Sequence, residues 1–195
     1  MHDLPDHLGG HANRTYLDPG ALTFFQREIG VRSMLDIGCA TGGMVRLAQS
    51  MGMRSHGIDG DWTLDWNDSS SFSCHDFSRG TFRPRDHYDL VWCCSFLEHL
   101  AQEFLPNIRD CVLSGRWLVT TWCDRQGHHH VNNQPADYWI RHFDHWGLEY
   151  RSDITQRLRA ATTLKMAKGQ VSAKSWIYHY GLVFENLEHA ALDLS

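Results

Sequence analysis

The 195-residue sequence lacks any apolar run of 18 or more residues, so no segment of it predicts a transmembrane helix. It also lacks a Cys-x-x-Cys pair and the pattern of a secretory leader. Its six cysteines fall mostly inside expected strands or at their ends, which is typical of reduced core thiols in a cytoplasmic protein. Internal repeats, low-complexity tracts and linkers are missing as well, and the length suits one domain.

The sequence has no excess of basic residues. Its 18 Lys and Arg residues face 23 Asp and Glu residues, which gives a net charge of −5. Non-specific binding to nucleic acids depends on Lys and Arg that neutralise phosphates, so this balance disfavours a nucleic-acid partner. A local basic patch between Arg151 and Lys174 remains an alternative, and so does a solvated surface without a ligand.

The most informative segment is a short apolar run followed by a glycine-rich turn. Residues 33–37 have the length and apolarity of a buried strand and include Asp36, and the turn reads Gly38-Cys39-Ala40-Thr-Gly42-Gly43. Helical spacing follows over residues 43–51. Glycine lets the backbone approach a ligand that a Cβ atom would block. The turn differs from the three-glycine dinucleotide fingerprint, which speaks against a nicotinamide-dependent oxidoreductase.

Acidic residues recur at the ends of the next expected strands. Residues 55–59 end in Asp59, about 20 residues beyond the turn, where a carboxylate can bind a ribose diol. Asp76 follows a third short strand, and residues 88–94 form a fourth that leads directly into Glu98-His99. The carboxyl ends of parallel strands share one edge of a sheet, so these groups are expected to converge.

Taken in this order, the motifs resemble the class I S-adenosylmethionine-dependent methyltransferases over roughly residues 22–183. The resemblance implies that the glycine turn wraps the methionine and ribose of S-adenosyl-L-methionine, with Ala40 where the family usually has glycine. It also implies that the residues after the fourth strand lie near the reacting methyl group. The implied cofactor-binding residues are Asp36, Gly38, Cys39, Ala40, Gly42, Asp59, Gly60, Asp76, Phe77, Cys94 and Glu98.

The expected fold is α/β, with a Rossmann-like, doubly wound, seven-stranded and mostly parallel sheet, helices on both faces and an antiparallel last strand. Residues 1–17 are predicted to be an arm or lid, and residues 18–195 a single methyltransferase domain. Asp18 is expected to cap a helix that Pro19 opens. The later elements are expected to be a helix at 97–111 broken near Pro106, a strand at 116–121, a helix at 135–146, and paired strands at 148–155 and 175–185.

The loop after the fifth expected strand carries three adjacent histidines followed by amides. His129 or His130 is predicted to act as a general base if the methyl acceptor is a hydroxyl, because an unperturbed imidazole titrates near pH 6.5. A solvated loop without a catalytic role is the alternative, and a purely structural role is the alternative for His99. The residues predicted to bind the acceptor are His11, Tyr16, His99, Trp122, His128 and Asn132.

The acceptor is expected to be a small molecule or a glycan. The Asp/Asn-Pro-Pro-aromatic motif of nucleic-acid amino-methyltransferases and the Pro-Cys nucleophile of cytosine enzymes are both missing after residue 94. The run His129-His-Val-Asn132, followed by Tyr138-Trp-Ile140 and by Gly181-Leu-Val-Phe184, is similar to small stand-alone methyltransferase-like proteins, many of them encoded by bacteriophages. No metal is predicted, because Cys94 or Ser95 stands where catechol-type enzymes place an Asp. A silent partner subunit or sensor that only binds S-adenosylmethionine or S-adenosylhomocysteine is the alternative function.

Overall fold

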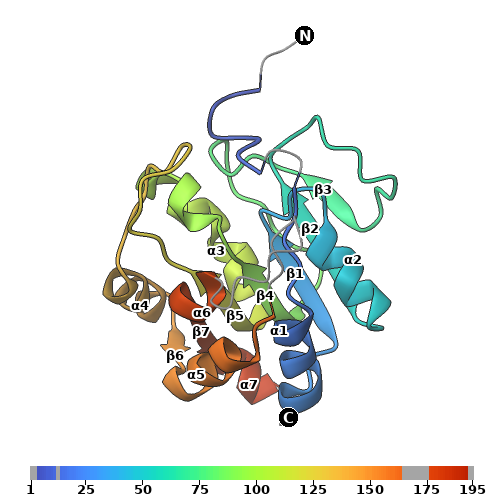
Figure 1. Ribbon diagram of the computed structural model, residues 1–195, viewed down its shortest axis with the longest axis vertical. Helices are drawn as coiled ribbons and strands as arrows, with labels where there is room; N and C mark the ends of the chain where they lie inside the picture. Colours follow the sequence, from blue (N-terminus) through green and yellow to red (C-terminus); the bar gives the residue numbers. More distant parts are fainter. Residues whose placement is uncertain (1–3, 12–13, 164–175, 193–195) are drawn as a thin grey trace.

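The apolar runs of the sequence form a seven-stranded sheet in the order β3-β2-β1-β4-β5-β7-β6 (Figure 1). The computed structural model describes residues 4–11, 14–163 and 176–192. The first five strands in the sequence pair in parallel, and β7 runs antiparallel to both β5 and β6, so the predicted sheet is confirmed. The strands are β1 Ser33–Ile37, β2 Arg54–Asp59, β3 Phe72–Cys74, β4 Tyr88–Cys93, β5 Gly115–Thr121, β6 Leu148–Tyr150 and β7 Gly181–Asn186.

Helices cover both faces of the sheet, because successive side chains of each strand point to opposite sides. Leu35 and Val91 belong to the apolar cluster that packs against α3 and α4. Met34 and Trp92 belong to the cluster on the other face, which packs against α1, α2, α5 and α6. The helices are α1 Pro19–Phe24, continued by the π-helical turn η1 Phe25–Ile29, then α2 Gly43–Ser50, the 3-10 turns η2 Leu97–His99 and η3 Gln102–Phe104, α3 Leu105–Leu113, α4 Ala136–His145, α5 Ser152–Ala161, α6 Trp176–Tyr180 and α7 Leu187–Leu192.

Two of the predicted strands are wrong in part. The segment 148–155 forms β6 only as far as Tyr150, and Ser152 begins α5, which buries Ile154 and Leu158. The segment 175–185 begins with a helix, α6, although its aromatic residues are typical of strands, and β7 starts only at Gly181. Pro106 does not break a helix, because it lies in the first turn of α3, where its missing N–H leaves no bond unmade.

Asp18 joins the start of α1 to the segment after α5. Its buried Oδ1 accepts a hydrogen bond from the backbone N–H of Ala21 at 3.0 Å, which confirms the predicted helix cap, and another from the N–H of Thr163 at 2.8 Å. Its Oδ2 accepts a third from the hydroxyl of Thr162. One carboxylate therefore holds two helices together on this face of the sheet.

The arginines of the possible basic patch hold α5 in place. Arg151 pairs with Glu185, Arg157 pairs with Glu28, and Arg159 donates to the carbonyl of Gly181 at 2.8 Å. Lys165, Lys168 and Lys174, the lysines of the same segment, lie outside the described residues.

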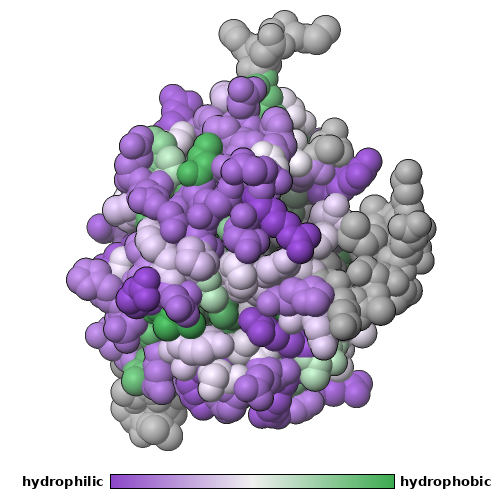
Figure 2. All heavy atoms as spheres, turned by 60° about the vertical axis from the view of Figure 1, so that its left-hand side comes forward, coloured by the Kyte–Doolittle hydropathy of each residue, from purple (hydrophilic) through white to green (hydrophobic). Residues whose placement is uncertain are grey.

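The surface shown in Figure 2 is mainly hydrophilic, with apolar residues only in small separate patches. Among residues 4–11, 14–163 and 176–192, no helix has the length and apolarity required to cross a bilayer.

Replacing Asp18 by Ala should lower the free energy of unfolding by about 2 kcal/mol, because the helix cap is lost and the N–H groups of Ala21 and Thr163 are left without their acceptor. Urea denaturation followed by circular dichroism measures this change. Asp144→Ala, at an exposed position of α4, is the control and should change the stability by less than about 0.5 kcal/mol. Equal stability of the two variants would contradict the assignment.

Candidate functional site

A cavity of about 500 Å³ opens at the carboxyl ends of β1 and β4, where the strand order of the sheet reverses. Ligands of open α/β sheets bind at this position because the loops diverge there. Every residue predicted to bind the cofactor lines the cavity except Gly42, and every residue predicted on the acceptor side lines it except His129 and Asn132. The cavity therefore joins the strand-end acids to the loop that follows β5.

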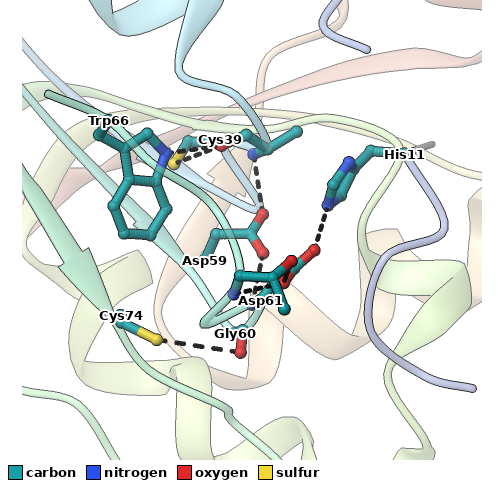
Figure 3. Close-up of polar contacts among 9 residues, drawn as sticks. His11, Cys39, Asp59, Gly60, Asp61, Trp66 and Cys74 are labelled. Atoms are coloured by element: carbon teal, nitrogen blue, oxygen red, sulfur yellow. Dashed lines mark hydrogen bonds and ion pairs between the residues drawn. The ribbon is translucent and has the colours of Figure 1, made fainter. Parts of the chain in front are cut away.

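Asp59, at the end of β2, connects the two loops on the cofactor side (Figure 3). Its Oδ2 accepts the backbone N–H of Ala40 at 2.8 Å, and its Oδ1 accepts that of Asp61 at 2.9 Å. A carboxylate has about four acceptor positions, so Asp59 can still accept hydrogen bonds from a ribose diol in the cavity. The predicted ribose-binding carboxylate is thus held in position by the turn that it faces.

The glycine turn follows β1 and has a left-handed backbone at several positions. Gly38 has φ +75°, and a Cβ atom there would come within 2.5 Å of the ring of Phe96, which lies against Phe77 at a ring distance of 5.9 Å. Ala40 adopts φ +48° without being glycine, and its carbonyl accepts the indole N–H of Trp66 at 2.8 Å. Gly42 allows the turn to pack closely against Phe72, because a Cβ atom at this position would come within 2.4 Å of the Phe72 ring.

Asp36 is a buried carboxyl in the wall of the cavity. Burial, and secondarily the negative charge of Asp59, raise its pKa to about 8, so the group carries a proton at neutral pH. At Asp76, hydrogen bonds from Ser78 and His7 outweigh the effect of burial and lower the pKa. A cationic ligand beside Asp36 would favour its ionised form.

The described part of the N-terminal segment lies across the cofactor side of the cavity. His11 Nε2 is 3.1 Å from Asp61 Oδ2 (Figure 3), and His7 Nε2 is 3.0 Å from Asp76 Oδ2. Tyr16 also lines the cavity and packs edge-on against Trp176 at 4.6 Å. Sequence reasoning missed Asp61 and His7. Asp61 could have been identified as an acid two residues beyond the strand end, whereas no local pattern distinguishes His7.

The three adjacent histidines of the loop after β5 point in different directions. His130 lines the cavity, and its ring meets that of His99 edge-on at 4.8 Å. His128 also lines the cavity, but His129 has φ +49° and packs near His7 at a ring distance of 5.9 Å. Asn132 is buried behind the wall, where its side-chain amide donates to the carbonyl of Leu100 at 3.0 Å.

Glu98 and His99 follow β4 and complete this end of the cavity. The backbone carbonyl of Glu98 accepts the N–H groups of Val131 and Asn132 at 2.9 and 3.1 Å, which attaches the histidine loop to the turn after β4. Burial raises the pKa of the Glu98 carboxyl. Burial, with the neighbouring His130, lowers the pKa of His99 to about 4, so this imidazole is neutral at neutral pH.

No family model and no curated protein matches the sequence, whereas solved structures do. One is a TehB-like S-adenosylmethionine-dependent methyltransferase from Corynebacterium glutamicum, which is 16% identical with a TM-score of 0.60, over 91% of this chain and 92% of that chain. Another is the methyltransferase domain of bacterial CtHen1-C, which is 12% identical with a TM-score of 0.57, over 86% and 95%.

A third is the magnesium protoporphyrin IX methyltransferase of Synechocystis with bound S-adenosylhomocysteine, which is 14% identical with a TM-score of 0.56, over 86% of this chain and 80% of that chain. At these identities the likeness shows the fold. The resemblance found in the sequence is thus confirmed as a class I methyltransferase fold, and the chemistry has to be argued from the cavity.

Replacing Gly38 by Ala should weaken binding of S-adenosylhomocysteine about tenfold or more, because the new Cβ displaces Phe96 in the cavity wall. Gly30→Ala is the matched control: Gly30 also has a positive φ, +88°, but a Cβ there meets no atom of the described residues within 4 Å. Both variants incur the same backbone strain of about 1 to 2 kcal/mol. Titration calorimetry should show weakened binding only for Gly38→Ala, and equal affinities would refute the role of this turn.

Replacing Asp36 by Asn should flatten the pH dependence of stability. Burial keeps the pKa of the folded carboxyl at about 8, whereas the unfolded carboxyl loses its proton near the ordinary aspartate pKa of 3.8. Its contribution to stability is therefore complete at low pH and declines as the pH rises from about 4 to 8. Urea denaturation across this range should show a smaller decline for Asp36→Asn than for the wild type, and parallel curves would disprove the protonated state. Asp144→Asn should follow the wild type.

Proposed function

We propose that the protein is an S-adenosylmethionine-dependent methyltransferase that transfers a methyl group to an oxygen or nitrogen of a small polar or glycan acceptor. The observation that carries the proposal is the continuous cavity between the strand-end acids and the histidine loop. In a fold that many such enzymes share, this arrangement suits a donor at one end and an acceptor at the other.

The residues on the donor side fit the cofactor. Asp59 has spare acceptor capacity for a ribose diol, and Asp36 is a buried acid that a cationic donor would ionise. A volume of about 500 Å³ lies within the range of about 300 to 1,000 Å³ for ligand sites. The donor supplies an electrophilic methyl group on a positively charged sulfur, and the turn from Gly38 to Ala40, which lines the cavity, would hold it.

The residues on the acceptor side would mainly position the acceptor. Methyl transfer requires the acceptor atom, the methyl carbon and the sulfur to be nearly collinear, and positioning can lower a barrier by about 7 to 11 kcal/mol. A general base typically adds about 10²- to 10⁴-fold in rate. His99, neutral at neutral pH, can accept a hydrogen bond from a hydroxyl or amine, and His128 and His130 line the same end. His130 is better placed than His129 to act as the predicted general base, because His130 lines the cavity and His129 does not.

The N-terminal segment and the cysteines support two further parts of the proposal. Residues 4–11 cover the donor side through the His7–Asp76 and His11–Asp61 contacts, which is consistent with a lid.

All six cysteines are free thiols, and burial raises the pKa of Cys93 and Cys94, which keeps them protonated. We infer a reducing compartment, the cytoplasm, as the site of action.

The proposal predicts that S-adenosylhomocysteine binds with micromolar or better affinity and that NAD does not bind. It also predicts that incubation with S-adenosylmethionine adds the mass of one methyl group to a compound in a metabolite or glycan pool. Calorimetry and mass spectrometry measure these outcomes, with Gly38→Ala as the binding-deficient control. Binding without transfer to any pool would favour the silent binder or sensor. Binding of NAD alone would reject both functions.

A further inference from the structure

We propose that Glu98, His99 and His130 bind one divalent transition-metal ion at the acceptor end of the cavity. The binding itself depends only on these side chains, whereas the role given to the ion below rests on the proposed methyl transfer. The sequence predicts no metal, because Cys94 or Ser95 stands where catechol-type enzymes place an Asp, so this site differs from that prediction.

The ligands converge because two loops are fastened together. Glu98 and His99 belong to the turn η2 after β4, and His130 comes from the loop after β5, more than 30 residues later. The N–H groups of Val131 and Asn132 both donate to the carbonyl of Glu98, which places His130 beside it. One ligand atom from each of the three side chains lies within 4.8 Å of the other two.

The carboxylate of Glu98 supplies an independent sign of a missing partner. Glu98 as a residue is 7% exposed, and its Oε2 has no hydrogen-bond partner among the residues that the structure describes. A buried carboxylate oxygen without a partner is costly, since the oxygen has given up its hydration. A cation held between Glu98 and the two imidazoles would supply the missing interaction.

The orientation of His130 leaves a nitrogen available for a metal. Its Nδ1 lies 2.8 Å from the carbonyl oxygen of Arg125, a contact in which the ring nitrogen must be the donor. With Nδ1 as the donor, the nitrogen of His130 that can offer a lone pair to a metal is Nε2. Metal-binding histidines commonly donate their other ring N–H to a carbonyl or carboxylate in this way, because the contact fixes the tautomer and the ring plane.

The donor set favours a first-row transition metal over Mg²⁺ or Ca²⁺. Two imidazoles and one carboxylate are ligands typical of Zn²⁺ and Fe²⁺, whereas Mg²⁺ and Ca²⁺ prefer oxygen alone. Two ligands of one ion at about 2.0 to 2.2 Å are at most about 4.4 Å apart, so the side chains must close slightly around it. Three protein ligands leave a further coordination position for another molecule.

All three ligand residues line the cavity, so the open position of the ion would face the acceptor. A bound divalent ion orients an oxygen ligand and lowers the pKa of a hydroxyl or water that it holds. The acceptor class that this site suits is therefore a compound with a hydroxyl or another oxygen donor. With the ion bound, the lone pairs of His99 and His130 would be taken up by the ion, and the ion in place of an imidazole would orient the acceptor. The proposed methyl transfer would then be narrowed from an oxygen or nitrogen acceptor to an oxygen acceptor.

Titration calorimetry on the 195-residue chain, stripped with a chelator and dialysed, tests the site with Zn²⁺ and Mn²⁺. The wild type should bind one equivalent of Zn²⁺, and Glu98→Gln and His130→Ala should each weaken binding at least tenfold. Two controls should bind as the wild type does: His129→Asn, in the same loop at a position where Asn tolerates a positive φ, and His145→Ala, exposed at the end of α4.

Absorption of Co²⁺ in the visible range gives a second measurement that reports the ligands directly. The d–d bands of the Co²⁺ protein should be lost in Glu98→Gln, a variant that keeps the size of the buried side chain and is expected to fold. No stoichiometric ion, or equal weakening by His129→Asn and His130→Ala, would overturn the metal site. Calorimetry with S-adenosylhomocysteine on the same stripped protein separates the two proposals: donor binding without any metal binding rejects the ion and leaves the transferase proposal standing.

Discussion

The carboxylate of Asp59 is the constraint on which the cofactor side of the cavity depends. It accepts one backbone N–H from the turn after β1 and one from the loop after β2, so neither segment can move away without breaking a hydrogen bond to this side chain. The left-handed turn at Gly38 and Ala40 and the contact between Asp61 and His11 are built around this junction. The junction lies next to the point between β1 and β4 where the strand order reverses, so it fixes one wall of the cavity.

The two ends of the cavity share an electrostatic property. Asp36 at the donor end and Glu98 at the acceptor end are both buried carboxyls whose pKa is raised by burial. Such groups destabilise the ligand-free protein in their charged form and gain most from a bound cation. A positively charged sulfur donor at one end and a divalent ion at the other would each satisfy one of them, which links the two proposals through the same physical cause.

The central strands could be predicted from sequence because each is a buried apolar run bounded by glycine or an acid. The predicted strands at 33–37, 55–59 and 116–121 each lie within one residue of β1, β2 and β5. The secondary structure after β6 was harder to predict from the sequence. Residues 152–155 and 176–180 are short, and their β-branched or aromatic side chains suit a strand, but packing of Ile154 and Ile177 against the sheet decides for helices α5 and α6.

The sequence by itself determined the order of the motifs, and with it the fold class and the acids and glycines that meet at the donor side of the cavity. The local sequence was sufficient to predict this side of the cavity, because a glycine turn and the acids that follow buried strands must meet at one edge of a parallel sheet. Only the tertiary structure decided which of the adjacent histidines faces the cavity and that His130 meets Glu98 and His99. The physical reason is that two backbone hydrogen bonds to the carbonyl of Glu98 set the register of the loop, and no periodicity along the chain encodes that contact.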